Sequence, residues 1–270
     1  MQIILDTTPF AALEADALVT YVFDESDPIQ GRIAELDKLA GGLLGRIGKS
    51  GELTGKNLEF TLVHGPAGLK SARLLLVGAG KREQFNPGSL RKVAGATLRY
   101  LKSRSVHKVA FLLREADMNE NTAQAVTEGV VAADFETDKY KTDKKNDKFI
   151  ESFTIAGFGD ADKAAGEKGI AKGRTIGEAQ NFARDLVNEP SNKLTPVILA
   201  GKAQAMAKEA GLAVEILDEK KIAELKMGAL LSVAQGGPEP PRMIVITYTP
   251  ANTKPGAPVI GLVGKAVTFD

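Results

Sequence analysis

The amino-acid sequence predicts an α/β protein made of two consecutive domains. Short apolar runs alternate with stretches of helical spacing over most of the chain, and this alternation resumes after Glu189. With 270 residues, of which 43% are hydrophobic and 26% charged, the chain is long enough for two ordinary globular domains.

Each expected element of the amino-terminal part follows from the spacing of its apolar side chains. Strands are expected at residues 1–5, 17–23, 58–64, 73–78, 106–113 and 149–158. Helices are expected at residues 29–40, 89–101 and 122–135. The glycine-rich residues 41–55 and the charged residues 136–148 are expected to form surface loops, because neither stretch offers a regular apolar face.

A single long helix is expected to connect the two domains, over residues 161–188. Each glycine inside an isolated helix costs about 1 kcal/mol relative to alanine. This helix nevertheless contains glycines at three- and four-residue spacing, namely Gly166, Gly169, Gly173 and Gly177. That spacing predicts that another element packs very close along one side. Pro190 ends the helix.

The second domain is expected to begin near Glu189. Thr195 as N-cap and Pro196 at the first helical position predict a helix to about Ala210, which Gly211 ends. Further elements are a helix from Asp218 and strands at residues 213–217, 243–248 and 259–263. Because strands and helices alternate again, we expect a mostly parallel sheet.

Composition excludes several classes of function. The net charge of +1 gives no overall attraction to nucleic acid or to a membrane surface. The absence of cysteine excludes disulfides, thiolate nucleophiles and cysteine-ligated zinc. With only His64 and His107, a three-histidine zinc site and an H-E-x-x-H motif are excluded, so metal chemistry would need carboxylates and a lysine. The first residues lack the features of a signal peptide, and no segment reaches the roughly 20 apolar residues that span a bilayer.

The residues of greatest chemical interest follow the last apolar run. Lys265 lies at the carboxyl end of the strand expected at 259–263, and Asp270 comes five residues later. Open α/β sheets bind their ligands at the carboxyl ends of strands. The structural alternative is a strand-end lysine that pairs with a loop carboxylate.

Three longer segments occur together in the second half of the chain. They are A-R-D-L-V-N-E-P-S-N-K-L-T-P at 183–196, M-G-A-L-L-S-V-A-Q-G-G-P-E-P-P-R-M-I-V-I at 227–246 and V-G-K-A-V-T-F-D at 263–270. In this order they resemble the leucine aminopeptidase family, the cytosolic two-metal exopeptidases, and L-L-L-V-G-A-G-K at 74–81 resembles it weakly. The resemblance implies a macrodomain-like α/β domain at 1–160, a connecting helix at 161–188 and the start of a catalytic domain at 189–270.

The resemblance also implies an activity. Family members release N-terminal amino acids, leucine preferred, from peptides with a free N-terminus, through a water activated by two divalent ions, Mn²⁺ or Zn²⁺. Carried over residue by residue, Lys265 would bind one metal and Asp270 would bridge both, although Ala266 replaces the family's usual glycine. The family's further ligands and its catalytic lysine and arginine follow T-F-D, so no catalytic residue is assigned and this chain alone is expected to be an inactive amino-terminal fragment. The complete protein is expected to be a cytoplasmic homo-hexamer.

Two other functions remain open. Residues 1–160 could form a regulatory module that holds a nucleotide-like ligand or DNA, but the scattered lysines give no concentrated phosphate-binding stripe. Gly78, Gly80 and Lys81 suggest a nucleotide loop, yet the residues that follow contain Pro87 and do not begin an apolar helix. A homologue that has lost activity is the third option, against which the retention of Lys265 and Asp270 argues.

Overall fold

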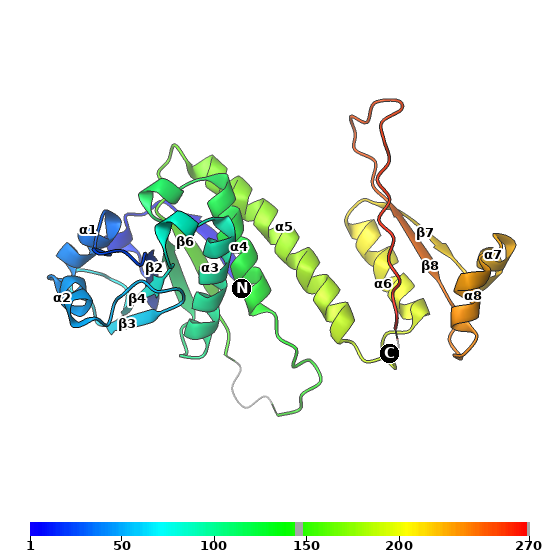
Figure 1. Ribbon diagram of the computed structural model, residues 1–270, viewed down its shortest axis with the longest axis horizontal. Helices are drawn as coiled ribbons and strands as arrows, with labels where there is room; N and C mark the ends of the chain where they lie inside the picture. Colours follow the sequence, from blue (N-terminus) through cyan, green and yellow to red (C-terminus); the bar gives the residue numbers. More distant parts are fainter. Residues whose placement is uncertain (144–147, 269–270) are drawn as a thin grey trace. The chain divides into compact units, whose positions relative to one another are not determined.

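The computed structural model describes residues 1–143 and 148–268 (Figure 1). The chain forms two compact units, Met1–Ala183 and Arg184–Asp270. Part of the charged stretch expected to be a loop, residues 144–147, lies outside the described residues, and its described remainder contains no helix or strand.

The first unit is built on a six-stranded sheet with the order β1-β6-β5-β2-β4-β3. Only β3 is antiparallel to its neighbour, β4, while the other pairs are parallel. This sheet confirms the α/β class with mostly parallel strands. The strands are β1 Gln2–Asp6, β2 Ala17–Val22, β3 Phe60–His64, β4 Arg73–Gly78, β5 Lys108–Leu112 and β6 Ser152–Ala156.

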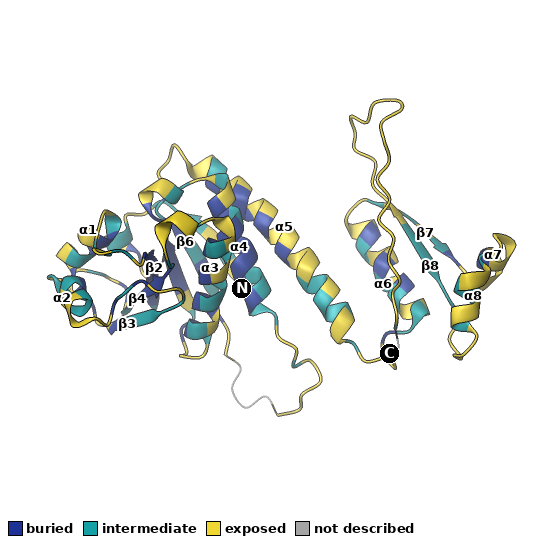
Figure 2. Ribbon diagram, in the orientation of Figure 1, coloured by how far each residue is buried: buried dark blue, intermediate teal, exposed yellow. Residues whose placement is uncertain are grey.

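Helices cover both faces of this sheet, which explains why its central strands are continuous apolar runs. Every residue of β2 is buried (Figure 2). Its apolar side chains are divided between two separate cores. Val19 and Tyr21 belong to the core that includes side chains of α3 and α4, whereas Leu18 and Val22 belong to the core of α1 and α2. The helices are α1 Arg32–Leu39, α2 Leu43–Ser50, α3 Pro87–Lys102, α4 Glu120–Asp134 and α5 Lys163–Asn188, with 3-10 turns at Phe10–Ala12, Arg82–Gln84 and Glu115–Asp117.

The glycines of α5 allow the close packing that their spacing predicts. A Cβ atom built on Gly169 would lie 2.3 Å from the carbonyl oxygen of Glu120, and one on Gly173 would lie 2.6 Å from that of Gln124. Both carbonyls belong to α4, so α5 approaches the backbone of α4 more closely than any larger residue would permit.

The prediction of a loop over residues 41–55 is wrong in its central part, because Leu43–Ser50 forms the helix α2. Leu44 is buried there, and Leu43 and Ile47 pack against the same core. The glycines flank this helix rather than preventing it: Gly42 and Gly51 adopt left-handed conformations at its two ends, with φ of 75° and 83°.

The second unit pairs a small sheet with three helices. The mostly parallel sheet expected in this part of the chain is not found among its described residues, because β7 and β8 pair in antiparallel fashion as a local two-stranded sheet. The mostly parallel sheet of the protein is that of the first unit. The expected N-caps are present: Ile198 N donates to Thr195 Oγ1 at 3.4 Å, and Lys221 N donates to Asp218 Oδ1 at 2.9 Å. The elements are α6 Pro196–Glu209, β7 Ala213–Leu217, α7 Glu219–Glu224, α8 Gly228–Ala234 and β8 Met243–Thr247.

The buried strand expected at residues 259–263 is not present. These residues have no assigned secondary structure, and the side chains of Val259, Ile260, Leu262 and Val263 are 86–101% exposed. A strand is held by hydrogen bonds to a neighbouring strand, and no described strand pairs with this segment. Apolar composition alone therefore did not produce a strand here. In the described part of the chain, no helix has both the length and the apolar character needed to cross a bilayer.

Candidate functional site

The structure describes only one of the two expected metal ligands. Lys265 lies in an exposed, extended segment beyond β8, and its side chain has no hydrogen bond or ion pair to the described residues. Asp270 lies outside the described residues. The geometry of this pair therefore stays a prediction from sequence.

The described residues also fail to form a metal site elsewhere. Over residues 1–143 and 148–268, no group of three or more histidine, cysteine, aspartate or glutamate side chains could hold a metal ion. A lysine amine binds a metal only after it loses its proton, which requires a desolvated site beside other ligands. Lys265 is exposed to solvent, so its surroundings here do not suit a divalent ion.

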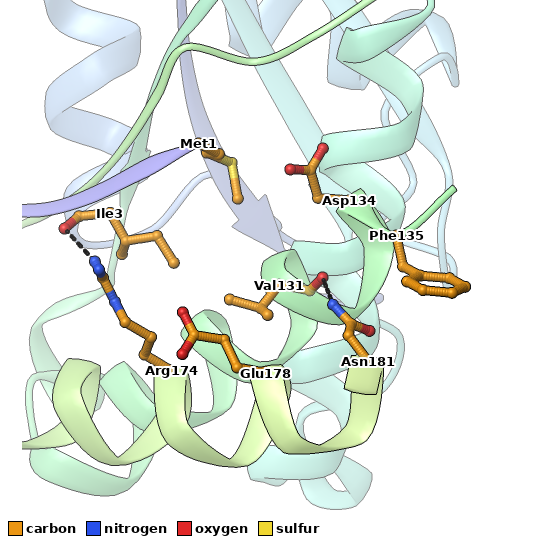
Figure 3. Close-up of a pocket in the computed structure, with 8 residues that line it drawn as sticks. All are labelled: Met1, Ile3, Val131, Asp134, Phe135, Arg174, Glu178 and Asn181. Atoms are coloured by element: carbon orange, nitrogen blue, oxygen red, sulfur yellow. Dashed lines mark hydrogen bonds between the residues drawn. The ribbon is translucent and has the colours of Figure 1, made fainter. Parts of the chain in front are cut away.

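A pocket of about 220 Å³ lies on the first unit, between β1, α4 and α5 (Figure 3). Three of the polar side chains that line it already have structural partners. Arg174 Nη2 donates to the carbonyl oxygen of Ile3 at 3.4 Å, and Asn181 Nδ2 donates to that of Val131 at 2.8 Å. Asp134 Oδ1 accepts from Lys102 Nζ at 2.9 Å. These bonds join α5 to β1 and α4, and α3 to α4, and they do not form an arrangement of nucleophile and base.

The sequence patterns did not identify one group of charged residues as a candidate site. Arg32, Arg82 and Arg114 lie near the carboxyl ends of strands of the large sheet, where α/β proteins bind ligands. Two of these arginines closely follow a buried strand, in G-A-G-K-R and F-L-L-R, and this position was the available signal. The nucleotide loop suggested by Gly78, Gly80 and Lys81 lies at this edge and includes none of the three arginines.

Comparison with known proteins decides the family. The family model described as "Cytosol aminopeptidase family, N-terminal domain" matches residues 19–144, and that described as "Cytosol aminopeptidase family, catalytic domain" matches residues 181–270. The two matched ranges together make up most of the chain. The chain belongs to the cytosol aminopeptidase family.

Individual cytosol aminopeptidases support this assignment. The chain is 43% identical over 270 residues to a "Probable cytosol aminopeptidase" of Solibacter usitatus, and the match covers 100% of this chain and 53% of that protein. It is 38% identical over 283 residues to a protein of the same description from Acidobacterium capsulatum, covering 100% of this chain and 55% of the relative. The chain therefore spans about half the length of the curated relatives it matches.

Solved structures show the same fold. A tomato leucine aminopeptidase mutant superposes with a TM-score of 0.79 and 25% identity, over 94% of this chain and 52% of that one. The bottromycin maturation enzyme BotP in complex with Mn superposes with a TM-score of 0.69 and 22% identity, over 88% of this chain and 46% of that one. At that identity, BotP shows similarity of fold alone.

Proposed function

We propose that this chain is the amino-terminal part of an aminopeptidase, in which residues 1–160 form the amino-terminal domain, 161–188 the connecting helix and 189–270 the start of the catalytic domain. The match of residues 181–270 to the catalytic domain of the family is the observation that carries this proposal. That range contains both Lys265 and Asp270. The share of the relatives that the chain spans supports the view that their remaining half completes the active site.

The proposed activity is the release of N-terminal amino acids, with leucine preferred, from peptides with a free amino terminus. The names of the relatives and of the tomato enzyme support this substrate class. Lys265 and Asp270 are proposed as the first ligands of two divalent ions, Mn²⁺ or Zn²⁺, and the Mn in the BotP complex is consistent with such ions. A cytoplasmic location and a homo-hexameric assembly of the complete protein belong to the same proposal.

This chain by itself is proposed to lack peptidase activity. Two ligands cannot fill the coordination shell of one tetrahedral or octahedral ion, and the described residues provide no alternative site. The exposure of residues 259–263 supports the same conclusion, because a metal ligand needs a rigid element to hold it.

The test compares this chain with a chimera in which it is followed by the carboxyl-terminal half of the Solibacter usitatus relative. Hydrolysis of a chromogenic leucyl amide is measured with Mn²⁺ or Zn²⁺. We expect activity from the chimera and none from the chain alone. Lys265→Ala and Asp270→Ala in the chimera are each expected to lower kcat/KM by at least about 100-fold, the scale on which a loss of metal-site geometry acts.

The matched control is Lys254→Ala, which removes another exposed lysine of the same segment and is expected to leave kcat/KM unchanged. Size-exclusion chromatography of each variant shows whether the chimera is folded. Metal-dependent hydrolysis by the chain alone would contradict the proposed need for further ligands. Full activity of Lys265→Ala in a folded chimera would contradict the proposed metal ligands.

A further inference from the structure

The large sheet of the first unit has a point at which its connections diverge. β2 is followed by β3 and β4, which lie on one side of it, whereas β5 is followed by β6 on the other side. β2 and β5 are adjacent and parallel, so their carboxyl ends lie side by side. In open α/β sheets, ligands bind at the carboxyl ends of strands where the connections diverge in this way.

Arg114 occupies this position, two residues beyond the end of β5. The residue is only 6% exposed, and its guanidinium carbon lies 5.0 Å from the ring centre of Phe23, which directly follows β2. Within the described parts of the chain, its side chain makes no hydrogen bond and no ion pair. A guanidinium has five N–H donors. The unbonded nitrogens of Arg114 are not fully buried, so these donors can reach a ligand from solvent.

The neighbouring charges are satisfied by one another rather than by Arg114. Arg82 Nε pairs with Glu25 Oε1 at 2.6 Å. The carboxylate of Asp117 accepts a short hydrogen bond from the hydroxyl of Tyr21. Neither Glu25 nor Asp117 makes an ion pair with Arg114, so the guanidinium of Arg114 has no hydrogen-bonding partner among these groups.

Two further arginines add positive charge to this edge. The guanidinium carbon of Arg82 lies 4.3 Å from the same Phe23 ring. Burial and then repulsion from Arg82 lower the pKa of Arg114, against weaker opposing effects of Tyr21, Glu115 and Asp117. Arg32 Nη1 donates to the carbonyl oxygen of Leu113 at 2.7 Å, and Arg32 Nε, 3.5 Å from Glu115 Oε1, is buried without a hydrogen bond. An anion bound to Arg114 would use free donors and reduce the repulsion between like charges.

A purely structural role as a cation–π contact is the alternative. Arg104 provides the comparison, because its guanidinium carbon lies 3.5 Å from the ring centre of Tyr100. Arg104 is exposed and also donates to the carbonyl oxygen of Tyr100 at 2.9 Å and to Ser103 Oγ at 3.0 Å. Its donors are satisfied, unlike those of Arg114, so the aromatic contact alone does not account for the state of Arg114.

We propose that the first unit binds a small oxyanion of the phosphate class at the carboxyl ends of β2 and β5, with Arg114 as its principal ligand. The planar donor pair of arginine matches two oxygens of a phosphate group. Arg82 and Arg32 supply supporting charge, while Glu25 and Glu115 compete with the anion for these arginines. The ligand is free phosphate or the terminal phosphate of a small molecule, and this site is independent of the aminopeptidase activity.

The experiment titrates the full chain with inorganic phosphate at constant ionic strength and follows the ¹⁵N–¹H signals of the arginine Nε groups. Sodium acetate and sodium chloride serve as control anions. We expect a saturable shift of the Arg114 signal with phosphate and none with chloride. Arg114→Gln is expected to weaken phosphate binding by at least about tenfold, the effect of losing a charge-assisted bidentate contact. Arg104→Gln is the matched control and is expected to bind like the wild type.

Two exposed variants keep the test valid if Arg114→Gln does not fold. Arg82→Gln is expected to weaken binding about threefold by removing a nearby charge, and Glu115→Gln to strengthen it about threefold by removing a competing carboxylate. Absence of a saturable shift in the wild type, or unchanged affinity in both arginine variants, would overturn the proposal.

The source of the phosphate group is identified by comparing ligands. Tighter binding of ADP than of phosphate would assign the site to a nucleoside diphosphate, and equal affinity would assign it to the free anion. Displacement of bound phosphate by duplex DNA, with a steep dependence on salt, would overturn the assignment to a small molecule.

Discussion

The six-stranded unit and the carboxyl-terminal segment contain similar apolar runs, but only the first unit buries them. β2 is buried along its whole length between β4 and β5, with helices on both faces. Residues 259–263 are equally apolar, and their large side chains remain almost fully exposed. The comparison shows that an apolar run becomes a strand only where neighbouring strands and helices provide hydrogen bonds and contacts.

The same substitution at two leucines should separate these regions most strongly. Leu75→Ala removes a fully buried side chain from β4 and is expected to lower the free energy of unfolding of the first unit by about 2–5 kcal/mol. Leu262→Ala removes an exposed side chain and is expected to change the free energy of unfolding by less than about 0.5 kcal/mol. Urea unfolding followed by circular dichroism measures both, and equal losses would mean that residues 259–263 are packed in solution.

Two helical glycines should respond to alanine with opposite signs. At Gly173 the new Cβ would lie 2.6 Å from the carbonyl oxygen of Gln124, so Gly173→Ala is expected to destabilise the first unit by about 1–3 kcal/mol. Gly201 in α6 has no atom within 4 Å of such a Cβ, so Gly201→Ala is expected to stabilise its helix by about 0.5–1 kcal/mol. Thermal unfolding tests this contrast. Stabilisation by both substitutions would contradict the close packing of α5 on α4.

The smallest expected effect concerns acid sensitivity of the first unit. Burial raises the pKa of Asp16. Hydrogen bonds from the backbone of Lys108 and His107, at 2.9 and 2.8 Å, together with attraction to His107 and Arg73, outweigh burial and lower this pKa below its ordinary value. The stabilisation is therefore present above the unfolded-state pKa of about 3.9 and is lost as pH falls through the lower folded-state pKa.

Asp16→Asn removes this titration. The variant should show a smaller loss of unfolding free energy between about pH 6 and about pH 3 than the wild type does. Asp160→Asn, at an exposed aspartate, is the matched control and should keep the wild-type slope. An unchanged slope in Asp16→Asn would show that this carboxylate does not link stability to pH.

Most of the first unit could be predicted from sequence because its strands are buried on both faces. Continuous apolar runs mark β2, β4 and β5 within two residues of each observed boundary. The strand order and the antiparallel β3 could not be predicted, since no local pattern encodes which strands pair. The helix α2 was missed because its flanking glycines favoured a loop, although Leu44 and Ile47 are spaced for a helical face.

The candidate sites show the same limit. Lys265 and Asp270 were found through a motif, but a motif does not show whether its residues are assembled, and Lys265 is exposed. Arg114 belongs to no motif, and its guanidinium lies beside Phe23, which directly follows β2 and is distant in sequence. Tertiary contacts, rather than local spacing, make that arginine unusual.

The most direct test of this account is amide hydrogen exchange of the intact chain, comparing residues 74–77 of β4 with residues 259–263. Exchange requires opening of the hydrogen bonds that hold a strand. The structure predicts strong protection in β4, whose residues are paired on both sides, and exchange at the rate of an unstructured peptide in residues 259–263. Comparable protection of both segments would contradict the account, because it would show that the carboxyl-terminal run already forms a strand in this chain.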